Sequence, residues 1–247
     1  MNFINKHAVI TGGSNGIGRC IAETFLREGA VVTVIDIDQS ASGGEFSNPE
    51  NVRFFRGDIA DKTVLENFVN SLELPVDYLI NNACIGRGGL LTPCSYEDFE
   101  YVQRVGVTAP YYLTSLLLQN NLLTENAAIV NISSTRAGQS QPDTEAYSAV
   151  KGAINALTHA MAVSLAGKVR VNAISPAWIE TSDNTTHSEQ DNRQHPSGRV
   201  GTPADIAELV LYLCSDKAGF INGENITIEG GMSKLMIYHD DCGWKLT

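Results

Sequence analysis

The stretch Ala8-Val-Ile-Thr-Gly-Gly-Ser-Asn-Gly-Ile-Gly18 decides the fold. Its first four residues predict a short buried strand, and a helical pattern follows from about Arg19 to Glu28. Strand, glycine loop and helix in this order favour dinucleotide binding, because glycines let the backbone approach a pyrophosphate and the helix N-terminus supplies N–H groups. The spacing is G-x-x-x-G-x-G, through Gly12, Gly16 and Gly18, and differs from G-x-G-x-x-G. The alternative interpretation is a tight turn that binds no ligand.

Strands and helices alternate along the rest of the chain. Further strands are predicted at Ala30–Asp36, Val52–Asp58, Asp77–Ala83, Ala127–Ser134, Lys168–Ser175 and Asn225–Glu229. Helices are predicted at Asp61–Ser71, Ser95 to about Leu118, Glu145–Leu165 and Pro203–Cys214. Gly106 and Pro110 disfavour regular helix and predict a kink in the second of these. We therefore expect one α/β domain over residues 1–247, Rossmann-like, with a doubly wound parallel sheet of about seven strands and helices on both faces.

Composition narrows the class of protein. The chain has 247 residues, 43% of them hydrophobic, and a net charge of −11, so nucleic acid and anionic membrane surfaces are unexpected partners. Neither a signal peptide nor an apolar run of membrane-spanning length is visible, which predicts a cytoplasmic location. The 5 cysteines are scattered without C-x-x-C pairs or histidine neighbours, so we expect neither a disulfide framework nor a metal site.

Asp36 bears on the choice of cofactor. It ends the second predicted strand, where a carboxylate can accept hydrogen bonds from a ribose 2′-hydroxyl and would repel a 2′-phosphate. No arginine or lysine stands at Ser14 or Asn15, or immediately after Asp36, to bind such a phosphate. The pattern favours NAD over NADP, against the alternative of an ordinary loop aspartate.

Ser134, Tyr147 and Lys151 form the candidate catalytic group. Tyr147 and Lys151 are four residues apart on a predicted helix and therefore share one face. An ammonium beside a phenol favours the phenolate, and such a tyrosine can exchange a proton with an alcohol. Ser134, at a strand end, could hold the alcohol oxygen. A solvated helix face is the alternative for the Tyr/Lys pair taken alone.

Together these segments resemble the classical short-chain dehydrogenase/reductase family from Thr11 to Gly231. The matching pieces are Thr11–Gly18, Asp58, Asn81-Asn-Ala83, Ile132-Ser-Ser134, Tyr147-x-x-x-Lys151, Asn172-Ala-Ile-Ser-Pro176, Thr181 and Glu229-Gly-Gly231. The resemblance implies that Tyr147 is the general acid/base, that Lys151 binds the nicotinamide ribose and that Ser134 positions the carbonyl. It implies NAD contacts at Gly12, Ser14, Asn15, Gly16, Ile17, Gly18, Asp36, Asp58, Ile59, Asn81, Ala83, Tyr147, Lys151, Pro176, Ile179 and Thr181.

The chain departs from the family pattern at Gly106. Family members usually carry an asparagine there, whose backbone carbonyl holds a water next to the lysine, and this water completes a proton relay to solvent. A glycine still offers that carbonyl, so we expect activity to survive, with slower proton transfer as the cost of the missing amide. Cys84, Ala177 and Glu229 also replace the usual glycine, glycine and aspartate.

The substrate pocket is expected between Ser134 and Tyr147 and around Trp178. Arg136, Gln139 and Trp178 are the candidate substrate contacts, and their polarity favours a polyol, a sugar-like alcohol or a hydroxy acid. Residues 182–198 are predicted to be a mobile loop that closes over the site, with His187 and His195 on the surface. Residues 233–247 contain many large apolar side chains and are predicted to pack on another subunit. The family resemblance implies that the assembly is a homotetramer, or else a homodimer.

The leading hypothesis is an NAD-dependent oxidoreductase that interconverts a secondary alcohol and a ketone. One alternative is an NADPH-dependent reductase of 3-oxoacyl thioesters or other carbonyls, which Asp36 disfavours. Another is a catalytically impaired NAD-binding protein, which only Gly106 supports.

Overall fold

The computed structural model describes residues 3–38, 46, 50–182, 185–236 and 238. Its strands are β1 His7–Thr11, β2 Val31–Asp36, β3 Val52–Arg56, β4 Val76–Asn81, β5 Leu123–Ile132, β6 Val169–Pro176 and β7 Asn225–Ile228. Its α-helices are α1 Gly16–Arg27, α2 Lys62–Asn70, α3 Tyr96–Gln103, α4 Ala109–Gln119, α5 Glu145–Ser164, α6 Glu189–Arg193 and α7 Pro203–Cys214. The predicted strands and long helices are confirmed, with ends that differ by a few residues.

All strands belong to one parallel sheet in the order β3-β2-β1-β4-β5-β6-β7. Strands β2 and β3 are added in turn on one side of β1, and the chain then crosses over to place β4 on the other side of β1. The strand order therefore reverses between β1 and β4, where Thr11 pairs with Asn81. In a doubly wound sheet, ligands bind in the crevice at this switch point, outside the carboxyl ends of the strands.

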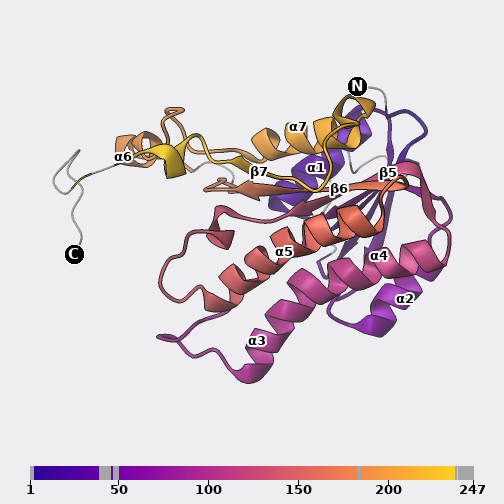
Figure 1. Cartoon of the computed structure of the whole chain (residues 1–247), viewed down its shortest axis with the longest axis horizontal. Coiled ribbons are helices and arrows are strands. Elements are labelled where there is room, and N and C mark those ends of the chain that lie inside the picture. Colours follow the sequence, from indigo (N-terminus) through magenta and orange to yellow (C-terminus); the bar gives the residue numbers. More distant parts are fainter. Residues whose placement is uncertain (1–2, 39–45, 47–49, 183–184, 237, 239–247) are drawn as a thin grey trace.

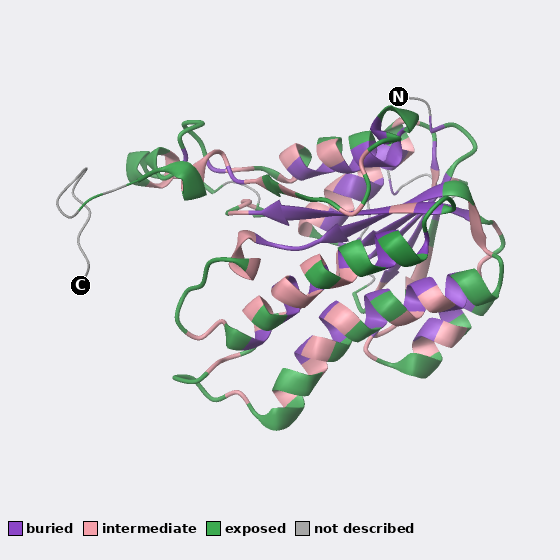
Figure 2. Ribbon diagram, viewed as in Figure 1, coloured by how far each residue is buried: buried purple, intermediate pink, exposed green. Residues whose placement is uncertain are grey.

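Helices cover both faces of the sheet, as Figure 1 shows: α2, α4 and α5 lie on one side, and α1 and α7 on the other. Strands β1, β2, β4 and β6 are buried almost throughout, which explains their largely apolar sequence, whereas the edge strands β3 and β7 are more exposed (Figure 2). Alternate strand residues enter the two cores. Ile10, Val34 and Ile80 pack with α1 and α7, whereas Val9, Ile35 and Leu79 pack with α2, α4 and α5. The predicted doubly wound α/β fold is confirmed.

The predicted kink between Ser95 and Leu118 is a π-helical turn at Arg104–Thr108, which joins α3 to α4. Pro110 lies in the first turn of α4, where its missing N–H is compatible with the altered hydrogen-bond ladder. Gly106 is buried inside the π-turn. The predicted kink is thus a π-helical turn within one continuous helix that runs from α3 to α4.

The segment at residues 182–198 was predicted to be a mobile loop that closes over the site, and this closure stays a prediction, but the segment includes a helix. Within its described residues, the short helix α6 begins with a capping box between Ser188 and Asp191. His195 was expected on the surface but is only 2% exposed, because it packs near Trp178 and against the chain around Gly230. Figure 1 places α6 beyond the carboxyl ends of the strands.

The C-terminal extension, residues 233–247, lies partly outside the described residues, because Ile237 and residues 239–247 are not described. Leu235, Met236 and Tyr238 are described and expose much of their apolar surface. Their packing on another subunit stays a prediction. Among the described helices, none is long and apolar enough to cross a membrane.

Candidate active site

In the glycine loop, the backbone at Gly12 lies very close to Ala83, and the backbone at Gly18 lies very close to Gly12. Gly12 has φ +68°, and a Cβ there would lie 2.9 Å from Ala83 Cα. A Cβ on Gly18 would overlap the Gly12 carbonyl oxygen. Helix α1 begins at Gly16 without an acidic residue in its own first turn, so its first N–H groups and positive dipole end are available to a ligand in the crevice. This loop fits the pyrophosphate of a dinucleotide.

Asp36 is held in place by two backbone donors at the end of β2. Ser14 N–H donates to its Oδ2 at 2.9 Å and Asp38 N–H to its Oδ1 at 3.0 Å. A second carboxylate stands beside it, since Asp38 Oδ2 accepts from Asn15 Nδ2 at 3.2 Å. The sequence reasoning missed Asp38, although an acid two residues after the strand end was visible.

Asp58 and Ile59 lie at the next strand end, after β3. The Tyr101 hydroxyl donates to Asp58 Oδ2 at 3.0 Å. Burial, and then the Asp58 carboxylate, raise the pKa of the Tyr101 phenol, so it keeps the proton that it donates. Tyr101 was not among the predicted residues, because it lies on the helix α3, whereas most of the predicted site residues were found by their position at the ends of strands.

Asn81 is outside the lining of the cavity, and its predicted role as a cofactor contact stays a prediction. It is 4% exposed, and its Nδ2 donates to Asn131 Oδ1 on β5 at 2.8 Å; Asn131 Nδ2 donates in turn to Thr158 on α5 at 2.9 Å. The next residue, Asn82, faces the glycine loop instead and donates to Gly12 O at 2.8 Å. Successive side chains at a strand end point to opposite faces, so only one of this pair can meet the loop.

Ser134, Tyr147 and Lys151 meet at the carboxyl end of β5. Lys151 is 3% exposed, its Nζ donates to Ile132 O at 2.7 Å, and it lies 5.3 Å from the centroid of the Tyr147 ring. Ser134 Oγ donates to Pro176 O at 3.4 Å and accepts from Arg136 N–H at 3.2 Å. The three predicted catalytic side chains therefore share one wall, with the ammonium fixed beside the phenol.

Gly106 packs directly behind this wall. A Cβ on Gly106 would overlap Val150 Cγ1 and lie 3.3 Å from Val150 Cβ. Val150 is fully buried on α5, between Tyr147 and Lys151 in sequence. The missing side chain thus lets the π-turn approach the helix that carries the catalytic pair, and no room remains there for an asparagine.

A cavity of about 550 Å³ runs along the crevice. The predicted residues that line it are Gly12, Asn15, Ile17, Gly18, Asp36, Asp58, Ile59, Ala83, Ser134, Tyr147, Lys151, Pro176, Ile179 and Thr181. Ser14 and Gly16 are outside this lining but belong to the same loop, where Ser14 is fully buried. Cys84, which stands where the family usually has a glycine, also lines the cavity. The sequence therefore located most of the cavity wall.

A second chamber of about 750 Å³ adjoins the first and shares Ser134 and Tyr147 with it. Arg136, Gln139 and Trp178, the predicted substrate contacts, all line this chamber. Gln194, which follows α6, lines it as well. The two chambers thus meet at the candidate catalytic residues.

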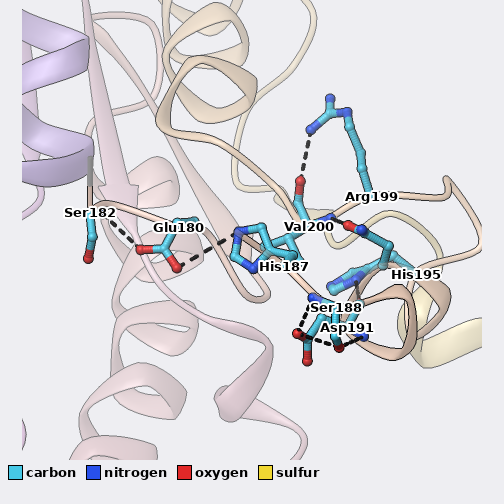
Figure 3. A network of polar contacts seen from close by, with 9 residues as sticks. Glu180, Ser182, His187, Ser188, Asp191, His195, Arg199 and Val200 are labelled. Atoms are coloured by element: carbon cyan, nitrogen blue, oxygen red, sulfur yellow. Dashed lines mark hydrogen bonds and ion pairs between the residues drawn. The ribbon is translucent and has the colours of Figure 1, made fainter. Parts of the chain in front are cut away.

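Trp178 connects this chamber to the segment that carries α6. The His187 ring stands edge-on to the Trp178 ring at a centroid distance of 5.3 Å, and His187 Nε2 lies 3.9 Å from Glu180 Oε2. Figure 3 shows Glu180 between Ser182 and His187; the Ser182 N–H, more than His187, holds the pKa of the Glu180 carboxyl below its usual range. The Trp178 side of the chamber is therefore held by the contacts of Glu180, Ser182 and His187.

Sequence comparison places this site among known proteins. The family model described as enoyl-(acyl carrier protein) reductase matches residues 12–233. An uncharacterized oxidoreductase of Thermotoga maritima is 42% identical, over 95% of this chain and 98% of its own. A 3-oxoacyl-(acyl-carrier-protein) reductase of Chlamydia trachomatis is 31% identical, over 94% of this chain and 98% of its own.

Two solved structures are similar along nearly the whole chain. An apo SCOR enzyme from Clostridium thermocellum has a TM-score of 0.88 and 44% identity, and covers 99% of both chains. A 4-hydroxyisoleucine dehydrogenase in complex with NADH has a TM-score of 0.85 and 28% identity, with 94% of this chain and 100% of that chain covered. Sequence, fold and site agree: the chain belongs to the short-chain dehydrogenase/reductase family of oxidoreductases.

Proposed function

We propose that this protein is an NAD-dependent dehydrogenase that interconverts a secondary alcohol and a ketone, with Tyr147 as the general acid/base. The meeting of Ser134, Tyr147 and Lys151 where the two chambers join carries the proposal. One chamber has the glycine loop and Asp36 expected of a dinucleotide site. The other is open to a substrate and reaches the same phenol.

The proton path follows from the hydrogen bonds of these residues. Ser134 Oγ, oriented by the Arg136 N–H, would release Pro176 O and donate to the substrate oxygen. The Tyr147 phenolate would take the proton of the alcohol, and in the reverse direction the Tyr147 phenol would return it to the ketone. Lys151, fixed by Ile132 O, would stabilise the phenolate through its charge. NAD, when bound, supplies the hydride acceptor next to the carbinol carbon.

The preference for NAD over NADP rests on Asp36 and Asp38. A 2′-phosphate at the end of β2 would meet the Asp36 carboxylate, with Asp38 bonded next to it, and no cation among the described residues that line the cavity there. The similar 4-hydroxyisoleucine dehydrogenase was solved with NADH. The 3-oxoacyl-thioester alternative agrees with the Chlamydia relative, but an NADPH-dependent enzyme would need a partner for that phosphate.

Replacing Asp36 with Ala should narrow the preference for NADH over NADPH by about tenfold to a hundredfold, because one like charge beside the 2′-phosphate is removed. Dissociation constants of both reduced cofactors, measured by fluorescence titration, check this. Glu73→Ala removes an exposed carboxylate elsewhere and is the matched control. Tighter binding of NADPH than NADH by the unaltered protein would refute the proposed cofactor.

The reaction itself is tested by the absorbance of reduced nicotinamide with NAD or NADP and a panel of secondary alcohols that includes polyols, sugar-like alcohols and hydroxy acids. Turnover with NAD supports the proposal. Binding of NAD without turnover of any panel member would favour the catalytically impaired alternative, whose only support is Gly106.

The assembly that we propose is a homotetramer, or a homodimer, with the C-terminal extension at a subunit interface. The exposed apolar side chains of Leu235, Met236 and Tyr238 support it. Light-scattering mass of the full chain, compared with a chain that ends before Leu235, tests it. A monomeric full-length protein would contradict the proposal.

A further inference from the structure

The chamber that receives the substrate carries one kind of charge. Of the described residues that line it, Arg136 is the only arginine, lysine, aspartate or glutamate. The whole chain carries a net charge of −11, so its general field repels anions. A lone cation inside this chamber therefore gives it a local preference opposite to that of the surface.

Arg136 is placed next to the reacting groups. Its main-chain N–H donates to Ser134 Oγ at 3.2 Å, and its guanidinium carbon lies 5.7 Å from the centroid of the Tyr147 ring. The guanidinium donates to the Gln141 side chain, which is neutral. Within the described part of the chain, no carboxylate forms an ion pair with Arg136. A guanidinium has five N–H donors in a fork that matches a carboxylate, so most of its capacity remains for a ligand.

We propose that the substrate is a small hydroxy acid, whose carboxylate binds Arg136 while its secondary hydroxyl lies between Ser134 and Tyr147. This inference rests on the proposed function and makes its substrate class specific. Since the guanidinium carbon lies 5.7 Å from the centroid of the Tyr147 ring, we expect the carboxylate and the carbinol carbon to lie within a few bonds of each other in one small molecule.

A carboxylate fits this chamber better than a phosphate. A carboxylate has one negative charge, which Arg136 alone neutralises in a bidentate pair. A phosphate monoester approaches two negative charges at neutral pH, and the lining offers no second cation among its described residues. A neutral polyol would leave the guanidinium with amide partners alone and would gain nothing from its charge.

The test compares matched substrates with NAD. We use 3-hydroxybutyrate and 2-hydroxybutyrate, the methyl esters of both acids, ribitol, and glycerol 3-phosphate. The esters keep the carbinol and lose only the charge. At least one acid should exceed its own ester by about tenfold to a hundredfold in kcat/KM, the range expected for a hydrogen-bonded charge pair.

The variant Arg136→Gln keeps a hydrogen-bonding amide and removes the charge. It should raise KM for the preferred acid by about tenfold to a hundredfold and change kcat/KM for the ester by less than about threefold. Arg136→Lys should restore part of the acid preference, because it returns the charge without the fork. The control Arg53→Gln removes a positive charge from the exposed edge strand β3 and should leave the preference unchanged.

A different role for Arg136 would change the kinetic constants of acids and esters in a different way. If its charge acted on Tyr147 instead of the substrate, Arg136→Gln would lower kcat equally for acids and esters and shift the pH profile of kcat. That result, or equal kcat/KM for acids and esters, overturns the inference. So does a preference for ribitol or for glycerol 3-phosphate.

Calorimetric binding separates this inference from the proposed function. The same acids and esters are titrated into the protein in the presence of NAD, without any need for turnover. Acid binding that Arg136→Gln weakens by tenfold or more supports the inference even where no alcohol is oxidised, a case in which only the proposed reaction fails. Acid binding that is absent, or unchanged by the variant, overturns the inference while leaving turnover of neutral alcohols possible.

Discussion

Replacing Tyr147 with Phe should lower turnover by about 10²- to 10⁴-fold, the usual contribution of a positioned general acid/base. The hydroxyl is the only part of the side chain that is lost, and the ring stays beside Lys151 and Arg136. Cofactor affinity should change by less than about threefold, because the glycine loop and Asp36 lie elsewhere in the cavity.

Steady-state rates and NADH titrations on the same preparation check this prediction. Tyr212→Phe on α7, a partly exposed tyrosine outside both chambers, is the matched control and should behave like the unaltered protein. A Tyr147→Phe variant that kept more than about a tenth of the activity would remove Tyr147 from its proposed role.

Replacing Gly106 with Asn should reduce both stability and activity, although family members usually have asparagine at this position. The new Cβ would overlap Val150 Cγ1, and overpacking of a buried contact costs about 1–3 kcal/mol of unfolding free energy. Relief of the overlap would displace α5, and a misplacement of about 1 Å in the catalytic pair can cost about a hundredfold in rate.

Thermal unfolding and steady-state kinetics of three variants measure this effect. Gly106→Ala tests the overlap without the asparagine amide. The double variant Gly106→Asn/Val150→Ala should recover much of the lost stability and activity, because Val150→Ala removes the overlapped atom. Gly152→Ala is the matched control, since a Cβ there meets only Ala137 O at 3.9 Å. A large gain in kcat for Gly106→Asn would contradict the packing argument and show instead that the missing amide limits proton transfer.

Much of this site was predictable because parallel strands end at one edge of the sheet. Asp36, Asp58 and Ser134 each follow a buried apolar run, so their proximity could be expected without the strand order. Tyr147 and Lys151 needed only the helical spacing. These residues depend on local patterns that the sequence displays directly.

Other features depend on contacts that no local pattern reveals. Which of Asn81 and Asn82 meets the glycine loop depends on the facing of β4, and a strand buried on both sides shows no alternation from which to read it. Helix α6 is polar throughout, and its only signal was the Ser188–Asp191 capping pair. The fit of Gly106 against Val150 joins distant segments, so the glycine could be noticed but its purpose could not be derived.

The hydrogen-bonded chain from Asn81 through Asn131 to Thr158 also has a consequence for folding. Asn81 pairs with Asn131 across β4 and β5, and a slip of one residue would turn one of these amides toward the opposite, apolar face. Each buried amide left without its partner costs about 1–3 kcal/mol. The chain of amides therefore selects against misaligned pairing of the two central strands. Ser134 is only three residues beyond Asn131, so the correct pairing of β4 and β5 also fixes the position of the Ser134 hydroxyl relative to α5.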